Sequence, residues 1–263
     1  MPFIEANGTR LNYRIDGQDK APVVVLSNSL GTNLAMWDQQ IAALTQKFRV
    51  LRYDMRGHGL SNVTPGPYTI DGLARDVVSL LDALKIGDAH FCGISVGGAL
   101  GQWFGINAAN RFKSLVLSNT AARIGTAETW NTRIKTVREG GIAAIAEAVI
   151  SRWFTEGFIK KSPESVEATR QMLLRTPPDG YVATCAALRE MDQRETVACV
   201  SVPTLVIAGA KDAVTTPADA RFLVERIHGA QYVELNAAHL SNIEDADAFT
   251  DALIKFIAQQ EAN

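Results

Sequence analysis

The chain has 263 residues and a formal net charge of -2, with 47% hydrophobic and 21% charged residues. This composition is typical of a globular protein with a substantial buried core, and the length suits one domain that carries an insertion. The nearly balanced charge offers no basic surface for a phosphate backbone, so we expect no nucleic-acid partner.

In chain order, short apolar runs alternate with helical patterns, which predicts an α/β fold whose parallel strands are joined by crossover helices. The first two segments, at residues 3–5 and 11–16, are weaker and are expected to form an antiparallel edge. Six further strands are predicted at residues 23–27, 49–53, 89–92, 114–118, 204–208 and 231–235. Apolar side chains recur at spacings of three and four over residues 70–84, which indicates a helix that covers the sheet.

The alternation stops at residues 122–198, where helical patterns run almost without interruption and no strand is predicted. Pro163 and the pair Pro177 and Pro178 interrupt this stretch, as expected where new helices begin after short loops. We interpret residues 122–198 as a helical cap inserted into a core formed by residues 1–121 and 199–263. A cap above the carboxyl ends of the strands forms a pocket where open α/β sheets bind their ligands.

The cysteines and the N-terminal residues bear on the cellular compartment. Cys92, Cys185 and Cys199 are widely spaced and form no CxxC pair, so neither a disulfide framework nor a zinc site is predicted. The first ten residues lack the features of a secretory signal, and no apolar stretch approaches the roughly 20 residues that a membrane helix needs. We therefore expect a cytoplasmic protein that does not bind membranes.

Ser95 lies at the centre of the sequence Gly93-Ile94-Ser95-Val96-Gly97, which matches the GxSxG pattern of a nucleophile. A predicted strand leads into this pattern and a predicted helix follows it, which is the strand-turn-helix setting of a nucleophile elbow. Glycines on either side of the serine let the strand and the helix pass closely around a strained turn. We therefore predict that Ser95 is a catalytic nucleophile.

A serine hydroxyl needs a base to remove its proton, and a carboxylate to orient that base. In this type of fold the chain order is serine, then acid, then histidine, which excludes His58 and His90. Of the two remaining histidines, His228 ends an amphipathic helix, whereas His239 lies in a loop directly after the last predicted strand. We predict that His239 is the base.

The acid is expected after the strand at residues 204–208. Asp212 lies just past the end of that strand, and the competing Asp219 falls in the following helix. Ser241 and Glu244 have the spacing of a capping box, so they are expected to begin the C-terminal helix. We therefore assign the acid to Asp212.

Two backbone amides must bind the oxyanion that forms during acyl transfer. One comes from the residue after the nucleophile, which is Val96, and the other from the loop after an early strand. Residues 28–31 supply that loop, and the Leu30 amide is the expected second donor.

Several runs together resemble the 3-oxoadipate enol-lactonases of the α/β-hydrolase superfamily. The runs are residues 27–32, 52–61, 93–98, 118–125 and 238–244, so that the similarity extends nearly from end to end. The run at 52–61 is common across the superfamily, and His58 within it is expected to be structural. The resemblance implies an eight-stranded, mostly parallel sheet and the opening of a small lactone ring through an acyl-enzyme, with no metal or cofactor.

The lactone that this resemblance implies bears a carboxylate, whose burial requires a cationic partner. Trp130 and Arg133 stand three residues apart in a predicted cap helix, so both are expected to face the pocket. The tryptophan would pack on the ring and the arginine would pair with the carboxylate. Arg123 and Arg138 remain alternatives to Arg133.

Other functions are compatible with parts of the pattern. A carboxylesterase, a cofactor-free haloperoxidase-like enzyme or a carbon-carbon bond hydrolase would share the fold and the three catalytic residues. A dehalogenase or epoxide hydrolase with an aspartate nucleophile is disfavoured, because Ser95 occupies the nucleophile position. A hydrolase-like receptor that binds its ligand without turnover is a further alternative, although the intact nucleophile, acid and base argue against it.

Overall fold

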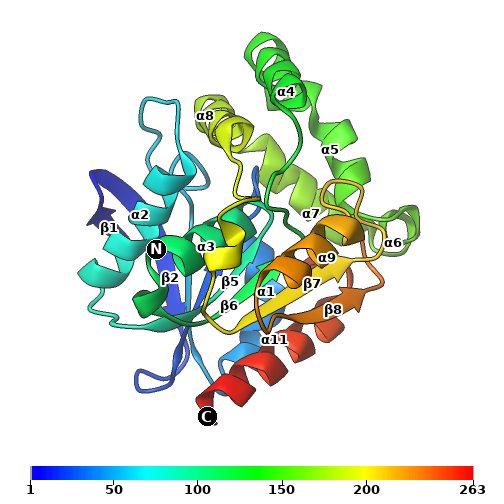
Figure 1. Ribbon diagram of the computed structural model, residues 1–263. Helices are drawn as coiled ribbons and strands as arrows, with labels where there is room; N and C mark the ends of the chain where they lie inside the picture. The colour runs from blue at the N-terminus through cyan, green and yellow to red at the C-terminus, as the bar shows by residue number, and fades with distance from the viewer. Residues whose placement is uncertain (1, 263) are drawn as a thin grey trace.

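The computed structural model describes residues 2–262, and its centre is a sheet of eight strands. The strands follow one another across the sheet in the order β1-β2-β4-β3-β5-β6-β7-β8 (Figure 1). They are β1 (Phe3–Ala6), β2 (Thr9–Asp16), β3 (Val23–Ser27), β4 (Arg49–Tyr53), β5 (Ala89–Ile94), β6 (Phe112–Ser118), β7 (Thr204–Gly209) and β8 (Gln231–Leu235). The α/β hydrolase fold expected from the sequence is confirmed.

The direction of the strands follows the prediction. β1 pairs with β2, and β2 with β4, in antiparallel fashion, whereas all neighbours from β4 to β8 are parallel. Every residue of β5 and β7 is buried, as continuous apolar runs indicate for strands that are covered on both faces. Because the parallel strands point the same way, the loops that follow β3, β5, β6, β7 and β8 meet at one edge of the sheet.

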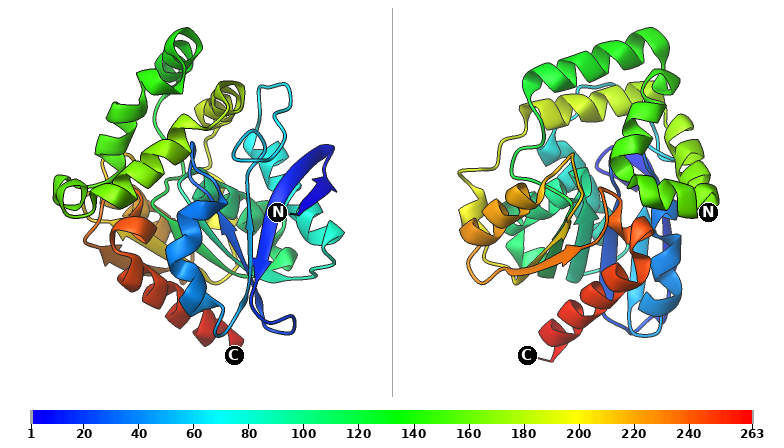
Figure 2. Two further views of the ribbon diagram at one scale, coloured as in Figure 1. Left: turned by 180° about the vertical axis from the view of Figure 1, so that it is seen from behind. Right: turned by 90° about the vertical axis from the view of Figure 1, so that its right-hand side faces the viewer.

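Helices cover both faces of the sheet (Figure 2). The helices α1 (Asp38–Leu44) and α11 (Ala246–Glu261) pack together on one face, and α2 (Ile70–Ala83), α3 (Val96–Asn107) and α9 (Pro217–Arg226) lie on the other. The predicted stripe of α2 is buried at Leu73, Val77 and Leu80. Five short helices join the longer elements: η1 (Leu34–Trp37), η2 (Ala109–Arg111), η3 (Ile142–Ala144), η4 (Val197–Cys199) and α10 (Ser241–Glu244).

Between β6 and β7 the chain forms a layer of helices that projects from the carboxyl edge of the sheet (Figure 1). The helices are α4 (Ala127–Gly140), α5 (Ala146–Trp153), α6 (Glu156–Lys161), α7 (Pro163–Leu174) and α8 (Pro178–Glu190). Pro163 and Pro178 are the first residues of α7 and α8, where a proline loses no helical hydrogen bond. The helices α4 and α8 pack along each other.

Two kinds of feature are absent from residues 2–262. None of the helices in this range is long and apolar enough to cross a membrane. In the same range, no group of three or more histidine, cysteine, aspartate or glutamate side chains is arranged to hold a metal ion.

Candidate active site

Ser95 sits in the sharp turn between β5 and α3. Its backbone has φ 60° and ψ -114°, a left-handed conformation that is uncommon for a residue with a side chain. Neighbouring groups hold this strained turn in place: the Ser95 amide donates to the Ser118 carbonyl at 3.0 Å, and the Thr120 hydroxyl donates to the Ser95 carbonyl at 2.8 Å. Strain of this kind is retained where the surrounding contacts fix it, and it is concentrated at functional sites.

The glycines on either side of Ser95 are required by close backbone approaches. A Cβ atom on Gly93 would lie 2.2 Å from the Gly97 carbonyl oxygen, and one on Gly97 would lie 2.4 Å from the Ser27 carbonyl oxygen. Both distances are far below van der Waals contact. The elbow therefore depends on both glycines of the GxSxG pattern.

Asp212 follows β7 and is almost completely buried. Its Oδ1 accepts hydrogen bonds from the amides of Val214 at 2.7 Å and Thr215 at 3.0 Å. Its Oδ2 accepts from the Thr215 hydroxyl at 2.9 Å, from Asn119 Nδ2 at 3.0 Å and from the ring of His239. Burial raises the pKa of Asp212, but the charge of a protonated His239 and these hydrogen bonds outweigh burial and lower the pKa to about 2.

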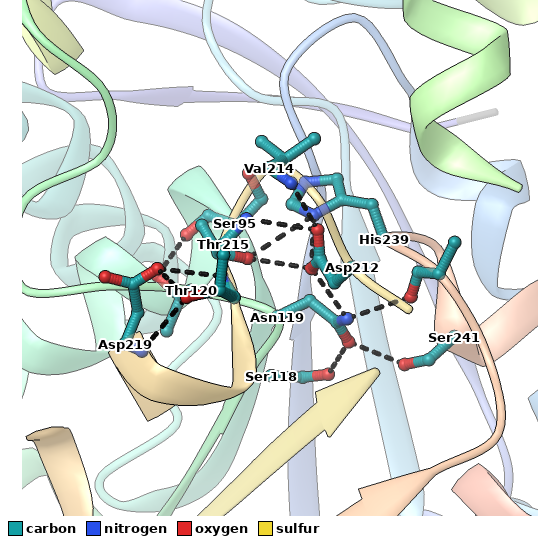
Figure 3. Close-up of polar contacts among 12 residues, drawn as sticks. Ser95, Ser118, Asn119, Thr120, Asp212, Val214, Thr215, Asp219, His239 and Ser241 are labelled. Atoms are coloured by element: carbon teal, nitrogen blue, oxygen red, sulfur yellow. Dashed lines mark hydrogen bonds and ion pairs between the residues drawn. The ribbon is translucent and has the colours of Figure 1, made fainter. Parts of the chain in front are cut away.

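His239 lies in the loop after β8 and is 1% exposed. Its Nδ1 donates to Asp212 Oδ2 at 2.8 Å, because an ionised carboxylate only accepts hydrogen bonds (Figure 3). This contact fixes the orientation of the ring and leaves Nε2 to act on other groups. The Ser95 and His239 side chains line the same cavity, and within residues 2–262 they are not yet hydrogen-bonded to each other. Such contacts commonly tighten only when substrate binds.

The amides of Leu30 and Val96 are the two predicted oxyanion donors. Leu30 lies in the loop between β3 and η1, and Val96 is the first residue of α3, so its N–H has no partner inside the helix. Within the described chain neither amide donates to another group, although both residues are buried. Both amides are therefore free to donate to a group bound at the cavity, whose wall includes Leu30.

A cavity of about 240 Å³ opens above Ser95 and His239. The core contributes Ser29, Leu30, Ser95, Ala213, Val214 and His239 to its walls, and the segment between β6 and β7 contributes Ile124, Gly125, Thr129, Trp130, Arg133, Val149, Arg152, Trp153, Tyr181 and Leu188. The cavity therefore lies between the sheet edge and the helical layer. Its walls are mostly apolar, with few polar groups, as is usual for a small-molecule site.

The charged groups of this cavity are all cationic. Arg133 and Arg152 line it, and none of its described wall residues is acidic. Arg133 Nη1 donates to the Tyr181 hydroxyl at 3.0 Å, and because burial raises the pKa of that tyrosine, its phenol does not neutralise the guanidinium. Arg123 instead lies 3.6 Å from Asp192, and neither Arg123 nor Arg138 belongs to the cavity wall.

Trp130 reaches the cavity from α4, as does Arg133. Its indole N–H donates to the Ile124 carbonyl, which fixes the ring against the loop before the helix. The sequence did not indicate Arg152 and Trp153 of α5, because no motif marks the end of that helix. It also missed Asn119 and Thr215, although Asn119 directly follows β6 and this position indicated the same sheet edge.

The expected capping box at Ser241 and Glu244 is wrong. The Ser241 hydroxyl donates to Asn119 Oδ1 at 2.6 Å, and the Glu244 carboxylate accepts from the amides of Ala238 and Thr155. Both side chains of α10 therefore bind other segments of the chain instead of capping the C-terminal helix. Asp219, the competitor for the acid, caps α9 through Thr216 and makes no contact with His239.

The other histidines lie away from the cavity. His58 is fully buried, and burial lowers its pKa to about 4. His90 is buried and contacts Ser114 and Glu261 through its two ring nitrogens. His228 is exposed just after α9. Of the four histidines, His239 alone lines the cavity.

Known proteins share this architecture and sequence. The family model for the alpha/beta hydrolase fold matches residues 22–140. The 3-oxoadipate enol-lactonase 2 of Acinetobacter baylyi is 48% identical over 250 residues, which cover 95% of this chain and 94% of that protein. The 3-oxoadipate enol-lactonase 1 of the same organism is 43% identical with the same coverage.

A solved structure gives the same result in three dimensions. The enol-lactonase from Burkholderia xenovorans LB400 superposes with a TM-score of 0.97 at 47% identity, and the match covers 98% of this chain and 100% of that one. The similarity thus includes both the sheet and the helical layer above it. The chain therefore belongs to the 3-oxoadipate enol-lactonase family of the α/β hydrolase fold.

Proposed function

We propose that this protein is a serine hydrolase that opens the ring of 3-oxoadipate enol-lactone to give 3-oxoadipate. The names of its relatives support this substrate. The observation that carries the proposal is one cavity that combines Ser95, the Asp212–His239 pair and two arginines without an acidic wall residue. A neutral ester would need no such charge, whereas an anionic lactone does.

The first half of the reaction forms an acyl-enzyme. The Ser95 Oγ attacks the lactone carbonyl carbon while His239 Nε2 takes the hydroxyl proton. The unpaired amides of Leu30 and Val96 stabilise the oxyanion, and Asp212 stabilises the imidazolium. When the intermediate collapses, the ring C–O bond breaks and the leaving oxygen takes the proton from His239. The released enol then tautomerises to a ketone, which makes ring opening favourable.

The second half of the reaction regenerates the serine. His239 removes a proton from a water molecule, whose oxygen attacks the acyl carbon, and the bond to Ser95 Oγ breaks as the serine regains its proton. The product is 3-oxoadipate with two carboxylates. These steps use only side chains and backbone amides of this chain, so the proposal includes no metal and no cofactor.

The helical layer supplies substrate recognition in this proposal. Residues 122–198 act as a cap on a core made of residues 1–121 and 199–263. Arg133 of α4 pairs with the substrate carboxylate, and Trp130 packs on the lactone ring. The hydrogen bond between Arg133 and Tyr181 supports this role, because it holds the guanidinium in the wall without cancelling its charge. Arg152 is a second cation in the same wall, and it makes no hydrogen bond or ion pair within residues 2–262.

A spectrophotometric assay tests the proposal. The loss of enol-lactone absorbance is followed with the wild-type protein and with Ser95→Ala, and we expect kcat to fall on the order of 10⁶-fold in the variant. Ser151→Ala is the matched control, because the Ser151 hydroxyl is exposed on α5 and contacts only a carbonyl of its own helix.

The same preparations are offered a neutral aryl ester and a diketone with a cleavable carbon-carbon bond. Preferential turnover of either compound over the lactone would replace the proposed function with esterase or carbon-carbon hydrolase activity. Tight binding of the lactone without any turnover by the wild type, unchanged in Ser95→Ala, would favour the receptor interpretation.

A further inference from the structure

Asn119 occupies the first position after β6 and is 2% exposed. Its backbone has φ 43°, so it is one of the few residues with a side chain in the left-handed region. The Asn119 amide donates to the Ile207 carbonyl of β7 at 2.8 Å, which ties the turn to the neighbouring strand. This backbone conformation directs the side chain across the sheet edge, toward the loops that follow β7 and β8 (Figure 3).

The orientation of the Asn119 carboxamide is set by two groups that only accept hydrogen bonds. Nδ2 donates to Asp212 Oδ2 at 3.0 Å and to the Ala238 carbonyl at 3.1 Å. Oδ1 therefore faces the other way, where it accepts from Ser118 Oγ at 2.8 Å and from Ser241 Oγ at 2.6 Å. One side chain thus joins the end of β6 to the loop of the acid and to the loop of the histidine.

We propose that Asn119 is a positioning residue that sets how strongly Asp212 holds the proton of His239. The inference rests on the proposed function of the same site. Asn119 Nδ2 and His239 Nδ1 donate to the same oxygen, Asp212 Oδ2. Each donor withdraws charge from that oxygen, so the side-chain amide of Asn119 weakens the attraction between the Asp212 carboxylate and the His239 imidazolium.

The direction of the effect follows from what remains when the amide is removed. Asp212 keeps the amides of Val214 and Thr215 and the Thr215 hydroxyl, which together preserve its orientation. The freed oxygen binds the imidazolium of His239 more strongly. A higher pH is then needed to obtain the neutral ring that acts as the base, and the acid limb of the pH profile moves upward.

Other charged groups surround Asp212 and His239, but the substitution of Asn119 leaves their own contacts unchanged. Glu244 accepts a hydrogen bond from the Ala238 amide behind the histidine loop, and Asp219 is bonded to Thr216 at the start of α9. Arg133 and Arg152 face His239 from the cap side of the cavity. The variants below leave all four groups in place, so a shift between variants reports the contact made by Asn119.

The test compares Asn119→Ala and Asn119→Asp with the wild type. The pH dependence of kcat/KM is measured with p-nitrophenyl acetate, a neutral ester that does not require the lactone pocket to be correctly assigned. The titration of His239 is followed in parallel by ¹⁵N NMR of histidine-labelled protein, which needs no turnover at all. A wild type that cleaves the ester but not the lactone would overturn the proposed substrate and leave this test valid.

The two variants and a control give distinct expectations. In Asn119→Ala the acid limb and the His239 titration move upward by about 0.5 to 1 pH unit. Asn119→Asp can still accept from both serine hydroxyls. Its added negative charge moves the acid limb and the His239 titration further upward. The control is Asn7→Ala. Asn7 also has a left-handed backbone, with φ 48°, and its side-chain amide also donates to a carboxylate, that of Asp76, at 2.8 Å from Oδ1. Unlike Asn119, it lies far from the cavity.

An upward shift in the Asn119 variants, absent from Asn7→Ala, supports the proposal. A uniform loss of activity at every pH, with the limb and the NMR titration unchanged, would assign Asn119 a purely structural role and overturn it. A downward shift would also overturn it, because it would mean that Asp212 turns away from His239. If Asn119→Ala does not fold, Asn119→Asp carries the same comparison.

Discussion

The two sides of the cavity are built differently. On the core side, Ser95, Asp212 and His239 are each at most 5% exposed, and Asp212 alone accepts five hydrogen bonds. On the cap side, Arg133 is half-buried with one hydrogen bond to Tyr181, and Arg152 is exposed. The core side is thus held rigidly by many short contacts, whereas the cap side offers charge with few constraints.

Under the proposed function, this difference separates chemistry from recognition. A catalytic group must keep its geometry to within a fraction of an ångström, and a dense hydrogen-bond network supplies that precision. A substrate carboxylate needs only a cation within reach, which a long side chain on a helix provides. Changes on the core side are therefore expected to reduce turnover of every substrate, and changes on the cap side to alter the choice among substrates.

Apart from the loss of the Ser95 hydroxyl itself, the largest effect is expected when Asp212 is replaced. Asp212→Asn keeps the size of the side chain but removes the charge that fixes the Nδ1–H tautomer of His239 and stabilises the imidazolium. We expect kcat for both the lactone and a neutral ester to fall roughly 10⁴-fold. Steady-state assays with both substrates check this, and a loss confined to the lactone would contradict the separation of the two sides.

The next effect concerns the free energy of unfolding rather than turnover. Its source is a buried histidine of the core that lies away from the cavity. His58 is buried as a neutral ring, with its pKa lowered by desolvation from 6.5 to about 4. A group whose pKa is depressed on folding stabilises the fold above its unfolded pKa, and this stability is lost as the pH falls from 6.5 toward 4. The loss amounts to about 3 kcal/mol across that interval.

Urea unfolding at pH 7 and at pH 4.5 measures this loss, with His58→Gln for comparison. We expect the free energy of unfolding of the variant to change less between the two pH values than that of the wild type. The exposed His228 provides the matched control, and His228→Gln should retain the full dependence of the wild type on pH. Equal pH dependence in the two variants would show that burial of His58 is not its source.

A smaller and more selective effect is expected on the cap side. Arg133→Ala removes the guanidinium that Tyr181 orients, so the substrate carboxylate loses its partner. We expect KM for the lactone to rise about 10- to 100-fold, with a change below about 3-fold for a neutral aryl ester. Steady-state kinetics with the two substrates decide the matter, and equal effects on both would remove Arg133 from the recognition of the carboxylate.

The smallest effect is expected for Arg152→Ala. Because this arginine is exposed and has no ion-pair partner among residues 2–262, water and salt screen its charge. We expect kcat/KM for the lactone to fall by less than about 5-fold at low ionic strength and to be nearly unchanged at high salt. A loss larger than that of Arg133→Ala would exchange the roles of the two arginines and make Arg152 the main partner of the carboxylate.

The sequence was sufficient to predict the sheet and the edge of it at which Ser95, Asp212 and His239 come together. β3 was predicted at its observed bounds, because a continuous apolar run is a local property of the chain. The positions of Ser95, Asp212 and His239 followed from the strands that precede them and from the chain order that is typical of this fold. The predicted capping role of Ser241 was wrong, because its hydroxyl donates to Asn119, which lies 122 positions away and is therefore invisible to a local pattern.

Local patterns of residues therefore identify the set of groups that follow the parallel strands, since those strands align their carboxyl ends whatever path the connecting helices take. The packing of the folded chain establishes which arginines of the helical layer face these groups, and that Asn119 joins the loops of Asp212 and His239. Those contacts depend on how α4, α5 and the loops pack, and no local pattern of residues encodes a distance between segments so far apart in the chain.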